Sequence, residues 1–385
     1  MNREGVDGVI IVDATPLQSE HRVRGVGTYT RQLSAALLGQ FGPDRLGFVL
    51  ERGEARDVSD AVRARSVTMW RPHKPAQVYW MYNEVILRQT LTQARPTLFH
   101  ATDFNGLVLS PRWRTVATLY DLTGLRVGPT GTSPSTLLSN LRWRVYYHRK
   151  LVQADHLIAI SQRVKDDVVT TLGYPRERVT VIPLGVDTGL YRPQRGEGRF
   201  ATAPGPYVAY SGSAEAHKNV ERLWTAFVRV SAEHADLHLY VCGRWRGEQV
   251  EWLQRAAKEA GLGARVEHLG YLSAQDQASL YANAAIFAFP SLEEGFGLPV
   301  LEAMACGAPV LTSDRSVLPE VAGDAALLVD PFSTDAIVDA MRRLLSEPGL
   351  TGELVLRGLR RVREYSWTET AAQTAAVYER VLADR

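Results

Sequence analysis

Short apolar runs alternate with longer amphipathic stretches along the first half of the chain. The runs that predict buried strands are residues 8–14, 96–101, 115–122, 156–161 and 178–187, and the helical patterns are 28–38 and 135–153. Strands separated by helices are typical of βαβ units, whose strands are parallel. We therefore expect a Rossmann-like α/β domain, with any ligand outside the carboxyl ends of its strands.

A second series of strands follows a polar interruption. Residues 191–206, YRPQRGEGRFATAPGP, are rich in Pro, Gly and Arg and predict an interdomain linker. The apolar runs after it are 206–212, 236–243, 265–272, 284–291, 308–314 and 325–330, with a helix expected from Asn219. The pattern therefore predicts a second Rossmann-like domain over 207–365, after a first domain over 1–190.

Length and composition agree with this division. A chain of 385 residues exceeds the ~250–300 residues at which single hydrophobic cores stop growing. No apolar run approaches the ~18 residues of a membrane span, and the start MNREGVDGVIIVD is a polar tail leading into a strand. The cysteines, Cys242 and Cys306, lack metal-ligand spacing. We therefore expect a soluble, cytoplasmic protein without a disulfide framework or zinc site.

Positive charge is concentrated in the first half of the chain. Residues 1–190 contain 24 Lys and Arg against 17 Asp and Glu, whereas residues 191–385 contain 20 against 25. This excess favours an anionic partner for the first domain. An arginine-rich solvated surface explains it as well, so the sequence leaves both interpretations open.

The segment PSLEEGFGLPVLEAMACGAP, residues 290–309, has the most specific pattern. A strand end and a glycine turn run into a helix, with Glu294 and Glu302 eight residues apart. Eight positions is a little over two helical turns, so both carboxylates can point to one side. Carboxylates accept hydrogen bonds from sugar or ribose hydroxyls, and N–H groups at a helix N-terminus face an anion. The alternative is an ordinary strand–turn–helix with Glu302 on a solvated face.

Two further glycine-containing turns suggest phosphate binding. Lys218 follows the turn in YSGSAEAHKN and precedes a helix, where an ammonium can neutralise a nucleotide diphosphate. An ordinary surface lysine is the alternative. Gly25 and Gly27 precede a helix of the first domain, but Thr30 stands where the third glycine of G-x-G-x-x-G belongs. Close approach of a ligand and a plain helix-capping turn both explain this glycine pair.

Polar residues end two predicted strands of the first domain. His100 and Asp121 both lie at the carboxyl edge of the expected sheet, where chemistry at a topological switch point would be sited. A histidine whose hydrogen bonds are satisfied inside the fold is the alternative for His100.

Together these segments resemble family 4 of the retaining glycosyltransferases. The likeness is carried by the E-x7-E block in its GFGLPVLEAMACG context, by 160–187 and 210–227, and by the amino-terminal VDATPL…RGVGTYTRQL, in family order. The resemblance implies the GT-B fold, in which two Rossmann-like domains face each other across a cleft and the C-terminal helix, 366–385, returns to the first. It also implies a nucleotide-diphosphate sugar as donor, with a preference for GDP-mannose from the similarity to bacterial mannosyltransferases.

The resemblance implies roles for individual residues. Glu294 and the N–H groups after it would bind the donor sugar, Glu302 the ribose, and Lys218 the leaving diphosphate. The expected catalytic residues are Lys218, Glu294, His100 and Asp121. The expected donor-binding residues are Gly25, Gly27, Gly212, Ser213, His217, Lys218, Leu272, Glu294, Gly295, Phe296, Gly297, Leu298 and Glu302.

The chain departs from the family pattern at two positions. Family members often carry Arg where this chain has His217, so the second positive charge beside Lys218 depends on protonation. They often carry His-Asp where this chain has Tyr120-Asp121. A phenol can donate a hydrogen bond there but cannot become cationic near neutral pH, so no histidine role passes to Tyr120.

No cofactor or metal is expected. The nucleotide sugar is a co-substrate, and the chain has no D-x-D pair to hold a divalent ion on the diphosphate. Two other classes share the architecture: a sugar phosphorylase or sucrose-synthase-like enzyme, and a catalytically silent sugar-binding scaffold. A pyridoxal lysine is not apparent, and a silent scaffold would lose Glu294, Glu302 or Lys218. Release of nucleotide diphosphate distinguishes these classes.

The acceptor is expected to be a hydroxyl of a saccharide, lipid-linked or small molecule, and nucleic acid is not expected as a partner. The stretch 135–153 is basic and aromatic, with Arg142, Arg144, His148, Arg149 and Lys150. Such a helix can contact an anionic membrane at its inner face, or a lipid diphosphate. A packed amphipathic helix with extended arginines is the alternative.

Overall fold

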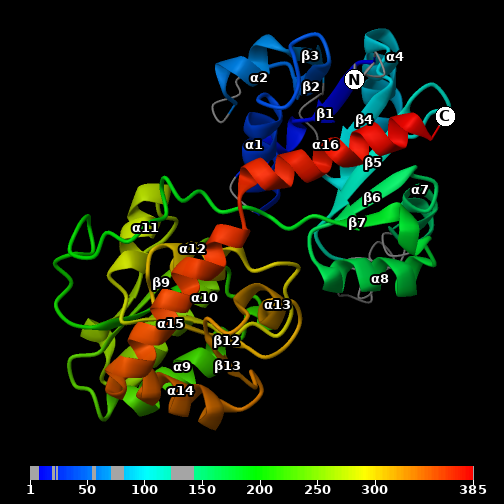
Figure 1. Ribbon diagram of the computed structural model, residues 1–385. Coiled ribbons are helices and arrows are strands. Elements are labelled where there is room, and N and C mark those ends of the chain that lie inside the picture. Colours follow the sequence, from blue (N-terminus) through cyan, green and yellow to red (C-terminus); the bar gives the residue numbers. More distant parts are fainter. Residues whose placement is uncertain are drawn as a thin grey trace. The chain divides into compact units, whose positions relative to one another are not determined.

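The protein, seen in a computed structural model, divides into two compact units (Figure 1). The structure describes residues 8–19, 22, 25–53, 58–70, 82–122 and 143–384. One unit combines the chain up to Gly185 with the carboxyl-terminal segment from Trp367, and the other is Val186–Ser366. Each unit is built around its own parallel sheet.

In the first unit, seven strands of the described chain form a parallel sheet in the order β3-β2-β1-β4-β5-β6-β7. Their bounds are β1 Ile10–Asp13, β2 Leu46–Glu51, β3 Ser66–Met69, β4 Leu98–Ala101, β5 Arg114–Leu119, β6 His156–Ala159 and β7 Val179–Val181. The central strands β1 and β4 are buried along their whole length, as expected of a sheet covered on both faces. The strand order reverses between β1 and β4, which marks the switch point of this sheet.

The sequence pattern missed two of these strands. In β2 the apolar run is interrupted by Gly47 and ends at Glu51, and β3 has four residues of which Met69 alone is buried. Strands this short and mixed give a weak periodic signal. Both pair in register with the sheet nonetheless, because β1 and β2 offer neighbouring backbone partners.

Short helices cover the first unit. Their bounds are η1 Thr15–Gln18, α1 Gly25–Leu37, α2 Asp60–Ala64, η4 Asn83–Leu87, α4 Arg88–Ala94, η5 Phe104–Gly106, η6 Trp143–Tyr147, α7 His148–Leu151, α8 Gln162–Leu172 and η7 Arg176–Arg178. Helix α8 shows how local sequence sets such bounds. The Ser161 hydroxyl accepts from the N–H of Val164 at its start, and Gly173 adopts a left-handed conformation at its end.

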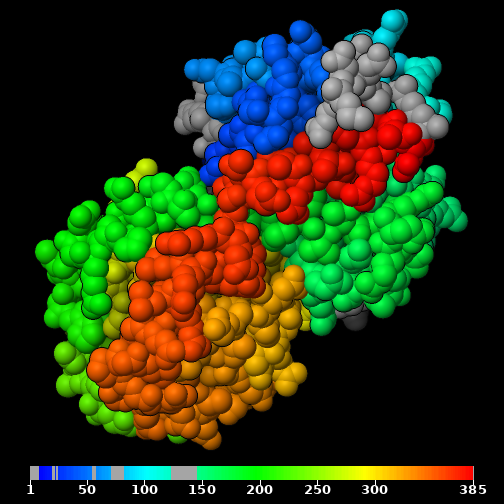
Figure 2. Space-filling model, viewed as in Figure 1, coloured from blue at the N-terminus to red at the C-terminus, as the bar shows by residue number. Residues whose placement is uncertain are grey.

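The C-terminal helix α16, Trp367–Ala383, packs on the first unit, as the GT-B expectation requires. Figure 2 shows this red helix at the surface between the blue and green parts of that unit. Arg45 pairs with Glu379 at 3.0 Å, and Thr370 Oγ1 donates to the carbonyl of Pro183 at 2.9 Å. The predicted return of this helix is therefore confirmed.

In the second unit, six described strands form a parallel sheet in the order β10-β9-β8-β11-β12-β13. Their bounds are β8 Tyr207–Ser211, β9 His238–Cys242, β10 Val266–His268, β11 Ile286–Phe289, β12 Val310–Ser313 and β13 Leu327–Val329. This is the strand order of a Rossmann sheet, and all of its strands lie within the predicted apolar runs. The order reverses between β8 and β11, so these two strands define the expected ligand edge.

Helices of the second unit connect these strands. Their bounds are η8 Ala216–Lys218, α9 Val220–Ser231, α10 Gly247–Glu259, η9 Gly263–Arg265, α11 Ala274–Ala282, α12 Leu298–Ala305, α13 Leu318–Ala322, α14 Thr334–Ser346, α15 Pro348–Arg361 and η10 Val362–Glu364. Aromatic side chains contribute to the core beneath them. The rings of Tyr207 and Tyr240, for example, lie 4.8 Å apart.

The segment expected to be a linker, 191–206, instead belongs to the second unit. The N–H of Phe200 donates to Ser279 Oγ at 3.1 Å, and the N–H of Gly196 donates to Asn283 Oδ1 at 2.7 Å. The Phe200 ring is buried against Tyr207. Composition suggested a linker because Pro, Gly and Arg outnumber the apolar residues. The buried rings of Tyr191 and Phe200, together with these backbone hydrogen bonds, nevertheless anchor the segment.

Candidate functional site

The carboxyl edge of the second sheet brings together a charged pair. Lys218 follows β8 and Glu294 follows β11, the two strands at which the order reverses. The Lys218 ammonium donates to both carboxylate oxygens of Glu294, at 2.7 and 2.9 Å. Their side chains are only 18% and 11% exposed, respectively, and the ammonium lies 5.6 Å from the centroid of the Phe289 ring. Two residues that the sequence assigned separately to the donor thus form one partly shielded ion pair.

Two loops are tied together beside this pair. The N–H of Leu292, after β11, donates to the carbonyl of His217, after β8, at 2.7 Å. The amide nitrogen of Asn219 donates to the carbonyls of Pro290 and Pro331, at 3.0 and 2.7 Å. Lys218 therefore lies between two residues whose contacts fix its loop against the loop that contains Glu294.

The glycine turn after Glu294 has its own steric requirement. Gly297 is left-handed, with φ of 99°, and is the N-cap of helix α12. A Cβ at this position would lie 2.7 Å from Leu318 Cδ2. Phe296 is buried with its ring 5.9 Å from that of Tyr365, so its side chain belongs to the core. Of the predicted donor-binding set, Phe296 therefore offers its backbone rather than its ring.

Glu302 lies on α12 in a different environment from Glu294. Its side chain is only 9% exposed. Burial raises the pKa of Glu302 to about 7, although the neighbouring Tyr191 hydroxyl favours the carboxylate. The alternative of a solvated helix face is therefore wrong for Glu302, and this carboxyl is partly protonated near neutral pH.

The loop after β8 contains the next predicted donor residues. Gly212 accepts a hydrogen bond from Trp245 Nε1 at 2.9 Å, and a Cβ on Gly212 would lie 2.7 Å from the Tyr210 hydroxyl. That hydroxyl donates to the carbonyl of Ser213 at 2.7 Å. His217 is partly exposed, with Nδ1 3.6 Å from Glu215. This loop is shaped by internal contacts and keeps His217 at the surface.

Two residues near Leu272 were missed by the sequence interpretation. Leu272 itself is buried, whereas Tyr271 beside it is 58% exposed. The guanidinium of Arg244, which follows β9, lies 5.5 Å from the Tyr271 ring centroid. Planar exposed groups of this kind can stack on a nucleobase. The signal available in the sequence was position alone, since Arg244 and Tyr271 follow neighbouring strands.

The expected catalytic histidine of the first unit, His100, is buried inside the fold. His100 on β4 is fully buried, with Nδ1 2.5 Å from the Tyr378 hydroxyl and Nε2 2.8 Å from Thr118 Oγ1. Burial lowers the pKa of His100 to about 3, so the ring is neutral. The Thr118 hydroxyl also contacts the Tyr29 hydroxyl at 2.9 Å. His100 therefore has the environment of a structural histidine, the alternative stated from the sequence.

Other expected residues of the first unit lie around its carboxyl edge. Asp121 is exposed, and the Tyr120 hydroxyl donates to the carbonyl of Thr102 at 2.8 Å. The hydroxyl hydrogen of Tyr120 therefore takes part in a hydrogen bond within the fold. A Cβ on Gly27 would lie 2.5 Å from the backbone of Arg22, whereas one on Gly25 meets no described atom within 4 Å. Close contact with the backbone of Arg22 therefore explains why position 27 is a glycine.

The basic stretch 135–153 is described in part. Residues up to 142, with Arg142, lie outside the described residues, as does the side chain of Arg144. Of the rest, Arg149 is exposed and Lys150 is buried. Lys150 therefore fits the alternative of a packed helix.

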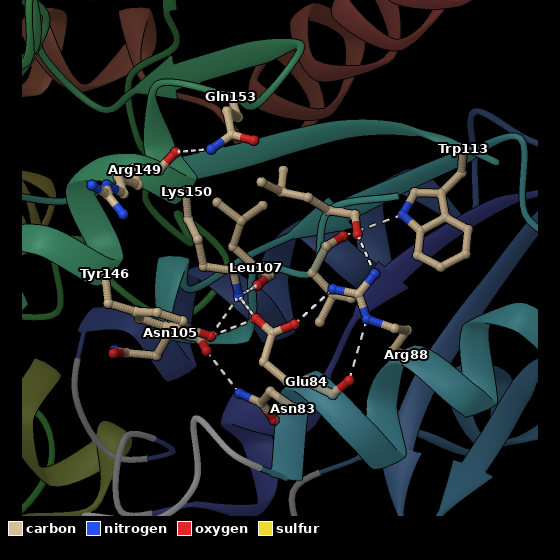
Figure 3. Close-up of polar contacts among 12 residues, drawn as sticks. Asn83, Glu84, Arg88, Asn105, Leu107, Trp113, Tyr146, Arg149, Lys150 and Gln153 are labelled. Carbon is tan, nitrogen blue, oxygen red and sulfur yellow. Dashed lines mark hydrogen bonds and ion pairs between the residues drawn. The ribbon is translucent and has the colours of Figure 1, made fainter. Parts of the chain in front are cut away.

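The partners of Lys150 form a polar cluster inside the first unit (Figure 3). Its ammonium pairs with Glu84 and lies 3.0 Å from the Tyr146 hydroxyl, and Arg88 pairs with the same carboxylate at 2.6 Å. Burial opposes ionisation of Glu84, but hydrogen bonds from Lys150, Tyr146 and Arg88 outweigh it and lower its pKa to about 2. The cluster joins η4 to η6 and α7, and the Lys150 ammonium is one of the groups that hold these helices together.

Two expected absences can be examined only where the chain is described. There, His, Cys, Asp and Glu side chains form no group of three or more suited to a metal ion. No described helix combines the length and apolar character needed to cross a bilayer. Metal independence and membrane contact both stay predictions.

Two family models match the chain. The model described as Glycosyltransferase Family 4 matches residues 23–190, and the one described as Glycosyl transferases group 1 matches residues 199–358. The second match contains Lys218, Glu294 and Glu302. The chain therefore combines a glycosyltransferase family 4 domain with a group 1 glycosyl transferase domain. The resemblance that the E-x7-E block suggested is thereby confirmed.

Curated relatives of this chain include bacterial mannosyltransferases. It is 30% identical to O-antigen chain mannosyltransferase B of Escherichia coli over 60% of this chain and 62% of the relative. It is 34% identical to the MMP alpha-(1->4)-mannosyltransferase of Mycolicibacterium hassiacum, over 60% of this chain and 55% of the relative. A third, serotype-specific mannosyltransferase WbdA of E. coli, is 28% identical over 97% of this chain and 48% of its own length. The chain thus spans about half to three fifths of these relatives.

Solved structures share the fold of this chain. Sucrose-phosphate synthase from Thermosynechococcus elongatus has a TM-score of 0.79 at 20% identity, covering 98% of this chain and 100% of its own. The lipopolysaccharide glycosyltransferase WaaG has a TM-score of 0.76 at 15% identity, covering 96% and 99%. Anabaena HepE, in complex with UDP and glucose, has a TM-score of 0.75 at 19% identity, covering 97% and 99%. The predicted GT-B fold is confirmed.

Proposed function

We propose that the chain is a metal-independent, retaining glycosyltransferase that moves a sugar from a nucleotide-diphosphate donor to an acceptor hydroxyl. The observation that carries the proposal is the Lys218–Glu294 pair, located where the strand order of a Rossmann sheet reverses. A mannosyl donor, with GDP as the first nucleotide to test, is supported by the names of the curated relatives.

The ion pair suits both halves of such a donor. The ammonium of Lys218 can neutralise the leaving diphosphate, and the carboxylate of Glu294 can accept hydrogen bonds from sugar hydroxyls. In the structure the two charges satisfy each other at 2.7–2.9 Å. Donor binding would replace this ion pair by two contacts, one from Lys218 to the diphosphate and one from Glu294 to the sugar. Both contacts would be stronger than in water, because the site is partly shielded.

The remaining donor contacts follow from the same edge of the sheet. Glu302, with a pKa of about 7, can accept a ribose hydrogen bond as carboxylate or donate one as acid. Tyr271 and Arg244 offer an exposed stacking surface beside Leu272. We assign the base to that surface, since it follows β9, which pairs with β8, and β10, the next strand beyond β9.

The relatives' names favour a saccharide acceptor, and a lipid-linked or small-molecule hydroxyl belongs to the same chemistry. A cytoplasmic location is supported by two buried free thiols, Cys242 and Cys306. Peripheral contact with an anionic membrane is supported by the excess of positive charge in residues 1–190. Arg149, which is exposed, contributes to this excess.

The test is release of nucleotide diphosphate from GDP-mannose, measured with and without a mannose-containing acceptor and with EDTA present. We expect acceptor-dependent release that survives EDTA, because fixed protein groups meet the leaving charge. Proton NMR of the first-formed product should show the anomeric configuration of the donor. Abolition by EDTA with rescue by Mg²⁺ or Mn²⁺ would contradict metal independence, and an inverted anomer would contradict retention. Absence of release from GDP-, UDP- and ADP-sugars alike would contradict the proposal as a whole.

A further inference from the structure

Non-glycine residues with left-handed backbone are concentrated at the site. Within the described chain, those with positive φ are Arg95, Asn219 and Ser316. Arg95 ends helix α4 in the first unit, an ordinary place for this conformation. The other two contact the loops of the Lys218–Glu294 pair. Non-glycine residues in this region are strained, and such strain persists where the surrounding structure holds it for a purpose.

Ser316 is the more unusual of the two, because serine adopts this conformation less readily than asparagine. It has φ of 59° and lies between β12 and α13. Its hydroxyl accepts from the N–H of Glu294 at 3.1 Å and donates to the carbonyl of the same residue at 2.9 Å. One side chain thus satisfies both backbone groups of the residue whose carboxylate meets Lys218.

The same loop supports the turn after Glu294. Leu318, two residues beyond Ser316, packs against Gly297 so closely that a Cβ there would lie 2.7 Å from it. Between Glu294 and Gly297 the turn contains Gly295, which restricts the backbone little. The position of the carboxylate therefore depends on what holds its backbone from outside the turn, and the Ser316 hydroxyl is the side chain that does so at Glu294 itself.

We propose that Ser316 is a positioning residue for Glu294: its strained backbone aims a hydroxyl that fixes where the carboxylate meets the donor sugar. The inference rests on the proposed function. It adds a specificity-determining residue that itself contacts neither sugar nor phosphate. Loss of the hydroxyl should act on the sugar step and leave nucleotide binding unaffected, because Asn219 still fixes the loop of Lys218 through the carbonyls of Pro290 and Pro331.

The test compares Ser316→Gly, Ser316→Ala and Ser316→Asn with the matched control Arg95→Gly. Glycine removes both the hydroxyl and the strain, alanine removes the hydroxyl alone, and asparagine tolerates the left-handed backbone while offering both a donor and an acceptor. We expect Ser316→Gly and Ser316→Ala to lose about tenfold or more in kcat/KM for the nucleotide sugar, since small misplacements are costly in a reacting geometry. Ser316→Asn should recover part of that loss, and Arg95→Gly should change kcat/KM by less than about twofold.

Nucleotide affinity and stability separate positioning from a structural defect. The Kd of free nucleotide diphosphate should stay within about twofold in all four variants, while discrimination between epimeric sugars falls in Ser316→Gly and Ser316→Ala. The melting temperature of Ser316→Gly should stay within about 2 °C of wild type, because strain relief offsets the greater freedom of the unfolded chain. If wild type is active and kcat/KM is unchanged in Ser316→Gly and Ser316→Ala, the positioning role of Ser316 is overturned and the proposed function is not. Wild type that binds no nucleotide diphosphate overturns the proposed function together with it.

Discussion

The two sheets have comparable switch points but different chemistry at them. In the second unit, β8 and β11 lead to Lys218 and Glu294, a charged pair that is partly exposed. In the first unit, β4 contains His100, which is fully buried, neutral and hydrogen-bonded through both ring nitrogens. Topology locates an edge in both units, but burial and hydrogen bonding decide which polar residues remain available to a ligand.

The difference has a physical cause in the C-terminal helix. Helix α16 packs on the first unit and supplies the Tyr378 hydroxyl to His100. A polar group covered in this way must be satisfied inside the fold, because an unpaired buried group is costly. Lys218 and Glu294 satisfy each other instead, and a polar ligand can replace either partner. The comparison predicts catalytic losses from changes at Lys218 and Glu294, and stability losses from changes at His100 and its partners.

The largest expected effect is that of Lys218→Ala. Removing the ammonium should cost about 2–4 kcal/mol of transition-state stabilisation, comparable with loss of one oxyanion-hole donor, or roughly 30-fold to 1000-fold in kcat/KM. Steady-state release of nucleotide diphosphate measures it. Lys258→Ala, at an exposed lysine on α10, is the matched control and should stay near wild type. A loss below about threefold for Lys218→Ala would make this lysine an ordinary surface residue.

Glu302→Gln should change stability in a pH-dependent way. The folded state raises the pKa of Glu302 from 4.5 to about 7, so between those pH values it binds a proton that the unfolded chain releases. Protonated Glu302 therefore contributes fully to the free energy of unfolding of wild type below about pH 4.5. This contribution, about 3 kcal/mol, is lost as the pH rises toward 7. Glutamine stays neutral and should not show this loss.

Denaturant unfolding of both proteins at pH 5 and pH 8 checks this expectation. The variant should be relatively more stable at pH 8 than at pH 5, measured against wild type at each pH. Parallel pH profiles for the two proteins would show that Glu302 ionises in the folded protein as it does in water.

Tyr378→Phe should have a smaller effect, confined to the first unit. It leaves Nδ1 of the buried His100 without its partner, at a cost of about 1–3 kcal/mol. The melting temperature should fall, while kcat/KM of the folded protein stays within about twofold. Catalytic loss with unchanged stability would contradict the comparison, since it would return His100 to the reaction.

Sequence patterns located much of this structure, and their failures share a cause. The strands of the second unit and the Glu294 turn have strong local signals, namely continuous apolar runs and glycine-flanked carboxylates. The role of Ser316 depends on a left-handed backbone and a contact 22 residues away, neither of which residue type reveals. His100 illustrates the same limit, because its partner Tyr378 is 278 residues distant. Long-range partners decide whether a polar residue is available.

The most direct test of the central claim is calorimetry of Glu294→Gln and wild type with GDP and with GDP-mannose. The claim is that the Lys218–Glu294 pair opens to receive the two halves of one donor. Neutralising Glu294 frees the ammonium, so GDP should bind the variant at least as tightly as wild type, while GDP-mannose loses the roughly 1.5–3 kcal/mol of a hydrogen bond to a charged group. Equal losses of affinity for GDP and GDP-mannose would contradict the account.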